Sequence, residues 1–149
     1  MILAVLDTNV LVSALLGPYG PSHYIFESWR QGKFELVTSL PCFQELDDVL
    51  HRGHIKGKYV SEDDIANYTL LLAKGATVVA VPQDPKPMCE DPDDDKFLVC
   101  ALLGKADVVV SGDPHLLEVN GIAGIAVVTP RDFAEAFLGG WQPTLPGIV

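Results

Sequence analysis

The stretch "DPDDDKFLVCALLGKADVVVSGD", from Asp91 to Asp113, joins a helix, a buried strand and an acid in the order that decides the fold. Pro92 suits the first turn of a helix, which continues through the apolar segment "KFLVCALL". The run from Asp107 to Val110 is continuously apolar after its first residue, which is typical of a strand buried on both faces of a parallel sheet. Asp113 comes just beyond the end of that strand.

The rest of the chain repeats this alternation of apolar strands and helices. Strands are predicted at residues 2–6, 34–37, 76–81, 107–110 and 125–128, and helices at residues 9–16, 22–31, 39–50, 61–74, 93–103 and 129–138. No repeat or linker divides the chain. This order predicts one domain over residues 1–138, an α/β/α sandwich around a mainly parallel sheet, followed by an extended tail over residues 139–149.

Composition limits the class of protein. The chain has 149 residues and a net charge of −10, which disfavours general adsorption to nucleic acid or to anionic membranes. No apolar run is long enough to cross a bilayer, and the segment Met1–Leu6 lacks the basic start of a signal peptide. The three cysteines and four histidines form no zinc pattern. We therefore expect a cytoplasmic protein with reduced thiols.

Two acids follow strands that we expect to be central. Asp7 ends the strand at residues 2–6, and Asp113 lies just past the strand at residues 107–110. In open parallel sheets, ligands bind beyond the carboxyl ends of the strands. A buried carboxylate is costly unless it is paired or coordinated, although each of these acids alone is also compatible with a helix cap or a turn.

The acids at the start of the helix at residues 93–103 divide into two groups. Asp91 suits the cap, Asp94 the third helical position, and Asp93 gains from the helix dipole. Asp95 has no such explanation, because it shares a helical face with Val99 and with residue 102. We predict that the Asp95 carboxylate points inward and needs a cation, which the strand-end acids can share.

A further candidate lies in the helix at residues 39–50. Glu45 borders the apolar stripe of this helix on one side, and Asp47 borders it on the other, so the helical pattern alone does not choose between them. Carboxylates without a cysteine or histidine cluster favour a hard divalent ion. We predict one or two Mg²⁺ or Mn²⁺ ions.

Four segments together resemble the PIN-domain nucleases. They are "VLDTNVLVSALL", an acid in the helix at residues 39–50, "EDPDDDKFLVCALLGKADVVVSGD" and "IAVVTPRDF". The resemblance runs from about Leu3 to Phe137. It is greatest to the toxins of prokaryotic toxin–antitoxin systems related to the VapC toxins. The ordered set "DTN", "DPDDDKFL" and "SGD" carries most of the resemblance, since "LDTNV" alone is common.

The resemblance implies an acidic pocket at the carboxyl edge of the sheet and Mg²⁺- or Mn²⁺-dependent hydrolysis of RNA. The residues that it assigns to catalysis and metal binding are Asp7, Glu45, Asp95 and Asp113. Those that it assigns to a supporting role are Asn9, Ser111 and Asp94. It further implies an antitoxin protein that blocks the pocket, and a homodimer. The composition, in turn, predicts no membrane partner.

RNA needs positive protein surface, and the segment "HRGHIKGKY" after residue 50 is the candidate. Arg52, Lys56 and Lys58 lie in it, and Tyr59 is able to stack on a base. An ordinary solvated loop has the same composition.

Two other functions compete with the nuclease. A Mg²⁺-dependent phosphatase of the haloacid-dehalogenase type also begins with an acid at the end of a strand, but it needs a second acid where this chain has Asn9. A non-catalytic acidic module that binds a metal or a partner is the other alternative. Binding of Mg²⁺ without cleavage of any RNA would favour the module.

Overall fold

The computed structural model describes residues 1–141, and its five strands form a single sheet that is parallel throughout. The strands are β1 (Leu3–Leu6), β2 (Glu35–Ser39), β3 (Thr77–Val79), β4 (Val108–Val110) and β5 (Ala126–Val128), in the spatial order β3-β2-β1-β4-β5. In the central register Val5 lies between Val37 and Val109. The predicted mainly parallel sheet is confirmed.

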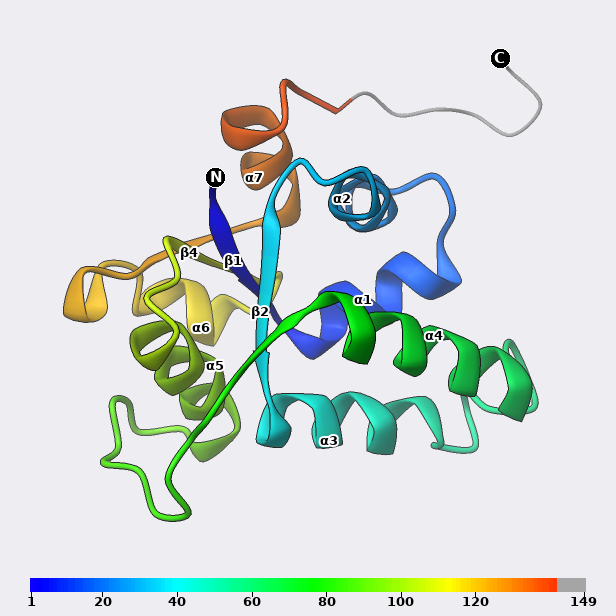
Figure 1. Ribbon diagram of the computed structural model, residues 1–149, viewed down its shortest axis with the longest axis horizontal. Coiled ribbons are helices and arrows are strands. Elements are labelled where there is room, and N and C mark those ends of the chain that lie inside the picture. The colour runs from blue at the N-terminus through cyan, green and yellow to red at the C-terminus, as the bar shows by residue number, and fades with distance from the viewer. Residues whose placement is uncertain (142–149) are drawn as a thin grey trace.

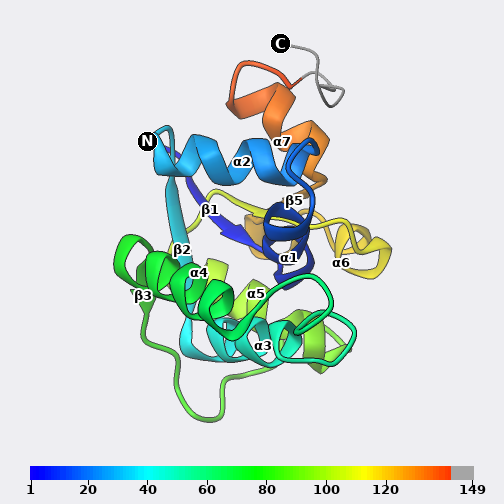
Figure 2. The same ribbon diagram turned by 90° about the vertical axis from the view of Figure 1, so that its right-hand side faces the viewer.

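Helices cover both faces of the sheet (Figures 1 and 2). They are α1 (Thr8–Leu16), α2 (Pro21–Arg30), α3 (Leu40–Leu50), α4 (Glu62–Gly75), α5 (Pro92–Leu103), α6 (Pro114–Glu118) and α7 (Pro130–Phe137). Alternate residues of β1 face opposite ways, so that Ala4 and Leu6 pack with α1, α2, α4 and α7, whereas Val5 packs with α5 and α6. The result is the predicted α/β/α sandwich.

Local sequence explains where the helices that border the site begin. Ser39 accepts a hydrogen bond from the backbone N–H of Cys42, which caps α3, and Asp91 caps α5 through the N–H of Asp93. Each of these two helices has a proline in its first turn, where the missing N–H costs nothing. Asp91 is therefore confirmed as a cap.

The chain between β4 and β5 differs from the prediction. Residues after Asp113 form the short helix α6 and a 3₁₀ turn at Ile122–Gly124, in a segment where no helix was predicted. Asp113 caps α6 and Pro114 opens it, and this pair is a helix-start signal that the sequence contained. Of the predicted tail, residues 142–149 lie outside the described residues.

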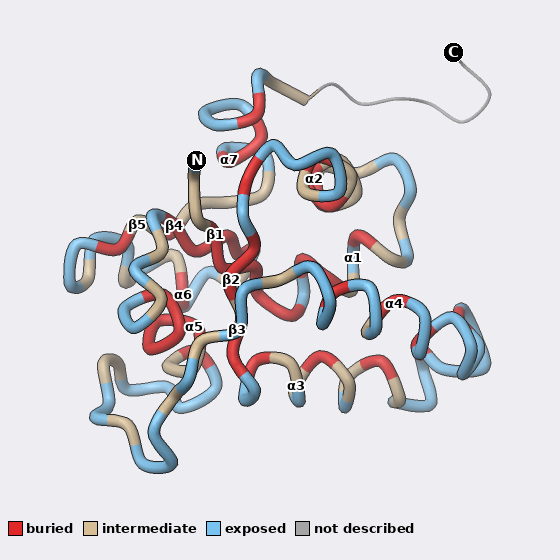
Figure 3. Tube along the Cα trace, in the orientation of Figure 1, coloured by how far each residue is buried: buried red, intermediate tan, exposed pale blue. Residues whose placement is uncertain are grey.

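Burial is greatest along the central strands and least in the connection between β3 and α5, as the tube in Figure 3 shows. All three residues of β4 are buried, and most residues from 80 to 91 are exposed. Within residues 1–141, no helix combines the length and the apolar character needed to span a membrane. Because β1 and β4 are paired and mostly buried, the positions of the acids that follow their carboxyl ends are set by the sheet.

Candidate functional site

Asp7 and Asp113 meet at the carboxyl edge of the sheet through a shared serine. The Ser111 hydroxyl donates to Asp7 Oδ2 over 2.6 Å, and the backbone N–H of Asp113 donates to Ser111 Oγ over 3.0 Å. Asp7 and Ser111 are buried, with 5% and 0% of their surface exposed. Burial, with repulsion from Glu45 and Asp113, raises the pKa of Asp7, although the bond from Ser111 opposes this shift.

Asp94 is the acid of α5 that lies with this pair. Only 8% of its surface is exposed, and within residues 1–141 no hydrogen bond or ion pair reaches its carboxylate. Burial, together with repulsion from Asp113, Asp91 and Asp7, raises the pKa of Asp94 to about 6. Asp94, which the sequence analysis gave only a supporting role, is thus an acid of α5 whose carboxylate is repelled by those of Asp7 and Asp113.

The predicted orientation of Asp95 is wrong. Its Oδ1 accepts hydrogen bonds from the backbone N–H groups of Met88, at 2.7 Å, and Cys89, at 3.0 Å. The carboxylate therefore ties down the loop before α5 and needs no cation. The error was one of helical phase, because Leu102, on the face expected to be buried, is 47% exposed.

The buried face of α5 follows Asp94 instead. Phe97, Leu98 and Ala101, at three, four and seven residues after Asp94, are all buried. The helical face of Asp94 carries Phe97, Leu98 and Ala101, whereas that of Asp95 carries Val99 and Leu102. Comparing the apolar character of these two faces would have identified Asp94 from the sequence.

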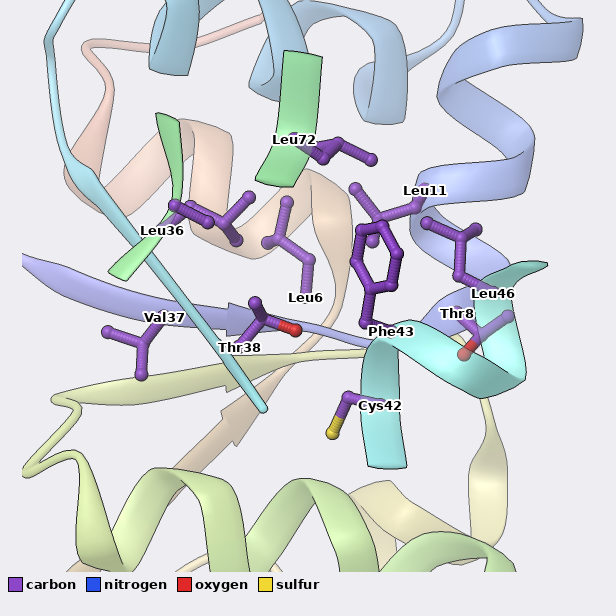
Figure 4. A pocket seen from close by; sticks show the side chains of 11 residues that line it. Leu6, Thr8, Leu11, Leu36, Val37, Thr38, Cys42, Phe43, Leu46 and Leu72 are labelled. Carbon is purple, nitrogen blue, oxygen red and sulfur yellow. The ribbon is translucent and has the colours of Figure 1, made fainter. Parts of the chain in front are cut away.

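Glu45 faces the site and has two partners that the sequence prediction missed. Lys96 Nζ donates to Glu45 Oε1 over 2.9 Å, and the Thr8 hydroxyl donates to Glu45 Oε2. Figure 4 shows Thr8 beside the part of α3 that carries Leu46. Lys96 lies about 100° round the helix from Asp95, and its long side chain reaches α3 from that position.

The choice left open between Glu45 and Asp47 is resolved by their contacts. Asp47 contacts His51, with 3.5 Å between Asp47 Oδ1 and the imidazole Nδ1, and 48% of the Asp47 side chain is exposed. Glu45 instead contributes to the raised pKa of Asp7. Asp7, Glu45, Asp94 and Asp113 are thus grouped at one edge of the sheet.

A cavity of about 350 Å³ opens beside these acids. Its polar lining includes Asp94, Asp91 and His115, and its apolar lining includes Met88 and Ile122. Asp94 therefore borders a space large enough for part of a substrate, next to the strand-end acids.

The chemistry of the donors fits a hard divalent cation. Burial, and then repulsion between the carboxylates, raises the pKa values of Asp7 and Asp94, and Asp94 has no protein donor among the described residues. Within residues 1–141, no three histidine, cysteine, aspartate or glutamate side chains converge into a ready-made metal cluster. The acids thus form a negatively charged edge that a cation stabilises, with their side chains spread rather than closed around one point.

The remaining predicted residues have different surroundings. The backbone N–H of Asn9 donates to Asp7 Oδ1 over 3.4 Å, while Asn9 itself is exposed. In the basic loop, Lys56 pairs with Glu62 over 2.6 Å, and Lys58 lies 5.2 Å from the ring centre of Tyr59. Arg52 is exposed. Part of the positive charge of this loop is therefore offset by Glu62.

Comparison with known proteins gives two matches. The family model described as "PIN domain" matches residues 4–115, the segment that runs from β1 into α6 and includes Asp7, Glu45, Asp94 and Asp113. The chain is also similar to "Uncharacterized protein MJ1680" of Methanocaldococcus jannaschii, at 29% identity over 142 residues, which cover 89% of this chain and 90% of that protein.

Proposed function

The chain belongs to the PIN-domain family of metal-dependent nucleases, and from this premise we propose that it is a ribonuclease that hydrolyses phosphodiester bonds with Mg²⁺ or Mn²⁺. The observation that carries the proposal is Asp94, which has 8% of its surface exposed, has no protein donor to its carboxylate among the described residues, borders a cavity and is repelled by Asp113 and Asp7. A carboxylate in this position is stabilised by a cation and destabilised by its neighbours.

Asp7, Asp94 and Asp113 are the residues that would hold the ion. The Ser111 hydroxyl donates a hydrogen bond to Asp7 and accepts one from the backbone N–H of Asp113. This one side chain therefore links the two proposed ligands Asp7 and Asp113. The ion, when bound, supplies Lewis-acid polarisation of a phosphoryl oxygen and activation of the attacking water. The buried strands behind the acids exclude water from that side of the site.

RNA is the substrate that we propose. The cavity beside Asp94 is open to solvent, so that a single-stranded RNA can enter it, and Met88 and Ile122 in its lining can make apolar contact with a base. The basic loop with Arg52, Lys56 and Lys58 follows α3 and is the proposed contact for the phosphate backbone.

We further propose that the protein is the toxin of a toxin–antitoxin pair, that an antitoxin protein covers the acidic edge, and that the toxin forms a homodimer. Support comes from the resemblance of the motifs to VapC-like toxins. Apolar side chains exposed at Leu16, Tyr19, Leu70 and Leu71 are further support, since exposed apolar surface favours protein contacts. Co-purification with the protein encoded by the neighbouring gene and the mass in solution would test these proposals.

Cleavage of short single-stranded RNAs tests the ribonuclease. We expect cutting by the wild-type protein with Mn²⁺ or Mg²⁺, none with EDTA, and none by Asp7→Asn, whose fold is checked by circular dichroism. Binding of Mn²⁺ without cleavage of any RNA would instead support a non-catalytic module. A phosphatase is not proposed, because position 9 is Asn9 rather than an acid.

A further inference from the structure

Lys96 brings a positive charge into the acidic site. It extends from the first turns of α5 to α3, where Nζ lies 2.9 Å from Glu45 Oε1. The side chains of Lys96 and Glu45 are only 22% and 24% exposed, so this ion pair is much less accessible to solvent than a surface pair. Among the four grouped acids, within the described residues, Glu45 alone pairs with a lysine or arginine.

Both oxygens of Glu45 have donors from the chain. Lys96 occupies Oε1, and the Thr8 hydroxyl occupies Oε2. Thr8 also lines a small space of about 10 Å³ with Leu46 and Cys42, which leaves room for no more than about one water molecule (Figure 4). The two hydrogen bonds therefore hold Glu45 between α1 and α5.

The other three acids differ from Glu45 in this respect. Asp94 has no donor within residues 1–141, and Asp7 and Asp113 accept hydrogen bonds from neutral groups, the Ser111 hydroxyl and the N–H of His115 respectively. The four acids thus comprise one charge-compensated carboxylate and three that still lack a cation.

We infer that Lys96 is a positioning residue that holds Glu45 beside the metal site as a neutral pair and keeps it from becoming a metal ligand. The inference rests on the proposed function, in which an ion binds at Asp7, Asp94 and Asp113. An extra carboxylate ligand would fill a position that the phosphate or the attacking water needs, because Mg²⁺ accepts few protein ligands and retains several waters. Lys96 therefore lowers metal affinity and raises turnover.

Binding of Mn²⁺ alone tests this inference without any cleavage. We would measure free Mn²⁺ by electron paramagnetic resonance in titrations of the wild type, Lys96→Met, Glu45→Gln and the double variant Glu45→Gln/Lys96→Met. The double variant replaces an ion pair with two neutral side chains of similar size, so the net charge of the site is unchanged. Its Mn²⁺ affinity should stay within about threefold of the wild type, because the charge near the ion is the same.

The single variants should move in opposite directions. Lys96→Met should bind Mn²⁺ about tenfold more tightly, and Glu45→Gln about tenfold more weakly, as expected for one unit charge within roughly a Debye length of the ion. At saturating Mn²⁺, Lys96→Met should cleave RNA with a lower kcat, and Lys96→Arg, which retains the charge, should restore both affinity and kcat. A loss of stability alone would not tighten metal binding.

The outcomes separate this inference from the proposed function. If the double variant loses about tenfold or more in Mn²⁺ affinity, the Glu45 carboxylate contributes to metal binding and the inference is overturned while the metal site stands. If the wild type binds no Mn²⁺, both the proposed function and the inference fail. Should Lys96→Met not fold, the comparison of the double variant and Lys96→Arg with the wild type still decides the question.

Discussion

At the scale of the residue, neighbouring acids on α5 have opposite surroundings. Asp94 faces two other acids and a cavity, and burial raises its pKa, whereas Asp95 accepts two backbone N–H groups. The two side chains differ by about 100° around the helix, and this rotation separates a carboxylate that lacks a donor from one that has two. The chemical role of each acid therefore depends on helical phase rather than on its place in the motif.

The pair of variants Asp94→Asn and Asp95→Asn tests this assignment. Asp94→Asn should lower metal-dependent RNA cleavage by at least about 100-fold, because even residues behind a metal ligand cost about 10- to 100-fold in affinity or activity. Asp95→Asn retains an oxygen acceptor for Met88 and Cys89 and should cleave within about threefold of the wild type. Rates measured side by side at saturating Mn²⁺ decide the matter, and the reverse pattern would return the site to Asp95.

At the scale of the element, the Asp95 side chain ties the exposed connection from residue 80 to residue 91 to α5. Asp95 joins the first turn of the helix to the N–H groups of Met88 and Cys89. Met88 also lines the cavity beside Asp94, so the shape of that cavity depends on the position of this loop. A structural acid thus supports the site without facing it.

Removal of this anchor should loosen the loop without unfolding the protein. Asp95→Ala leaves two N–H groups without their acceptor, at a cost of about 1–3 kcal/mol of unfolding free energy. We expect limited proteolysis within residues 80–91 to be faster in Asp95→Ala than in the wild type, with Asp95→Asn close to the wild type. Equal cleavage rates in all three proteins would mean that other contacts hold the loop.

At the scale of the whole molecule, the four acids make the carboxyl edge of the sheet a place of unfavourable charge. The parallel strands bring Asp7 and Asp113 together, and α3 and α5 add Glu45 and Asp94 from the two sides. Lys96 offsets one of these charges. The metal-free protein therefore carries an electrostatic cost that protonation reduces.

The stability of the metal-free protein should accordingly rise as pH falls. The folded-state pKa of Asp94, about 6, lies above its ordinary value of 3.8, so the folded protein binds a proton that the unfolded chain lacks between these values. This carboxylate therefore destabilises the fold fully above about pH 6, and the cost is relieved as pH falls through the window between the two pKa values. Urea unfolding in EDTA at pH 7 and pH 5 measures the difference.

The variant Asp94→Asn isolates this contribution. His51, whose pKa is raised by its hydrogen bonds to Asp47 and Glu62, also favours the fold at lower pH, and it remains in the variant. The gain in unfolding free energy from pH 7 to pH 5 should be smaller in Asp94→Asn than in the wild type. An identical gain in the two proteins would show that Asp94 titrates normally.

The alternation of strands and helices, the parallel sheet and the positions of Asp7 and Asp113 at strand ends could all be predicted from the sequence. These features follow from apolar runs, caps and prolines, which act within a few residues, and from the rule that parallel strands end at one edge. The resemblance to PIN domains likewise rested on motifs that can be read along the chain.

Which helical acids lie at that edge could not be predicted from the sequence, because it depends on contacts between distant segments. Contact with Lys96, which lies 51 residues away in sequence, distinguishes Glu45 from Asp47. Asp95 instead accepts hydrogen bonds from the backbone N–H groups of a loop without regular structure, and it does not join the site. A helical pattern specifies which side of a helix is apolar, but a polar residue at the border of that side is assigned by the partners that packing brings to it.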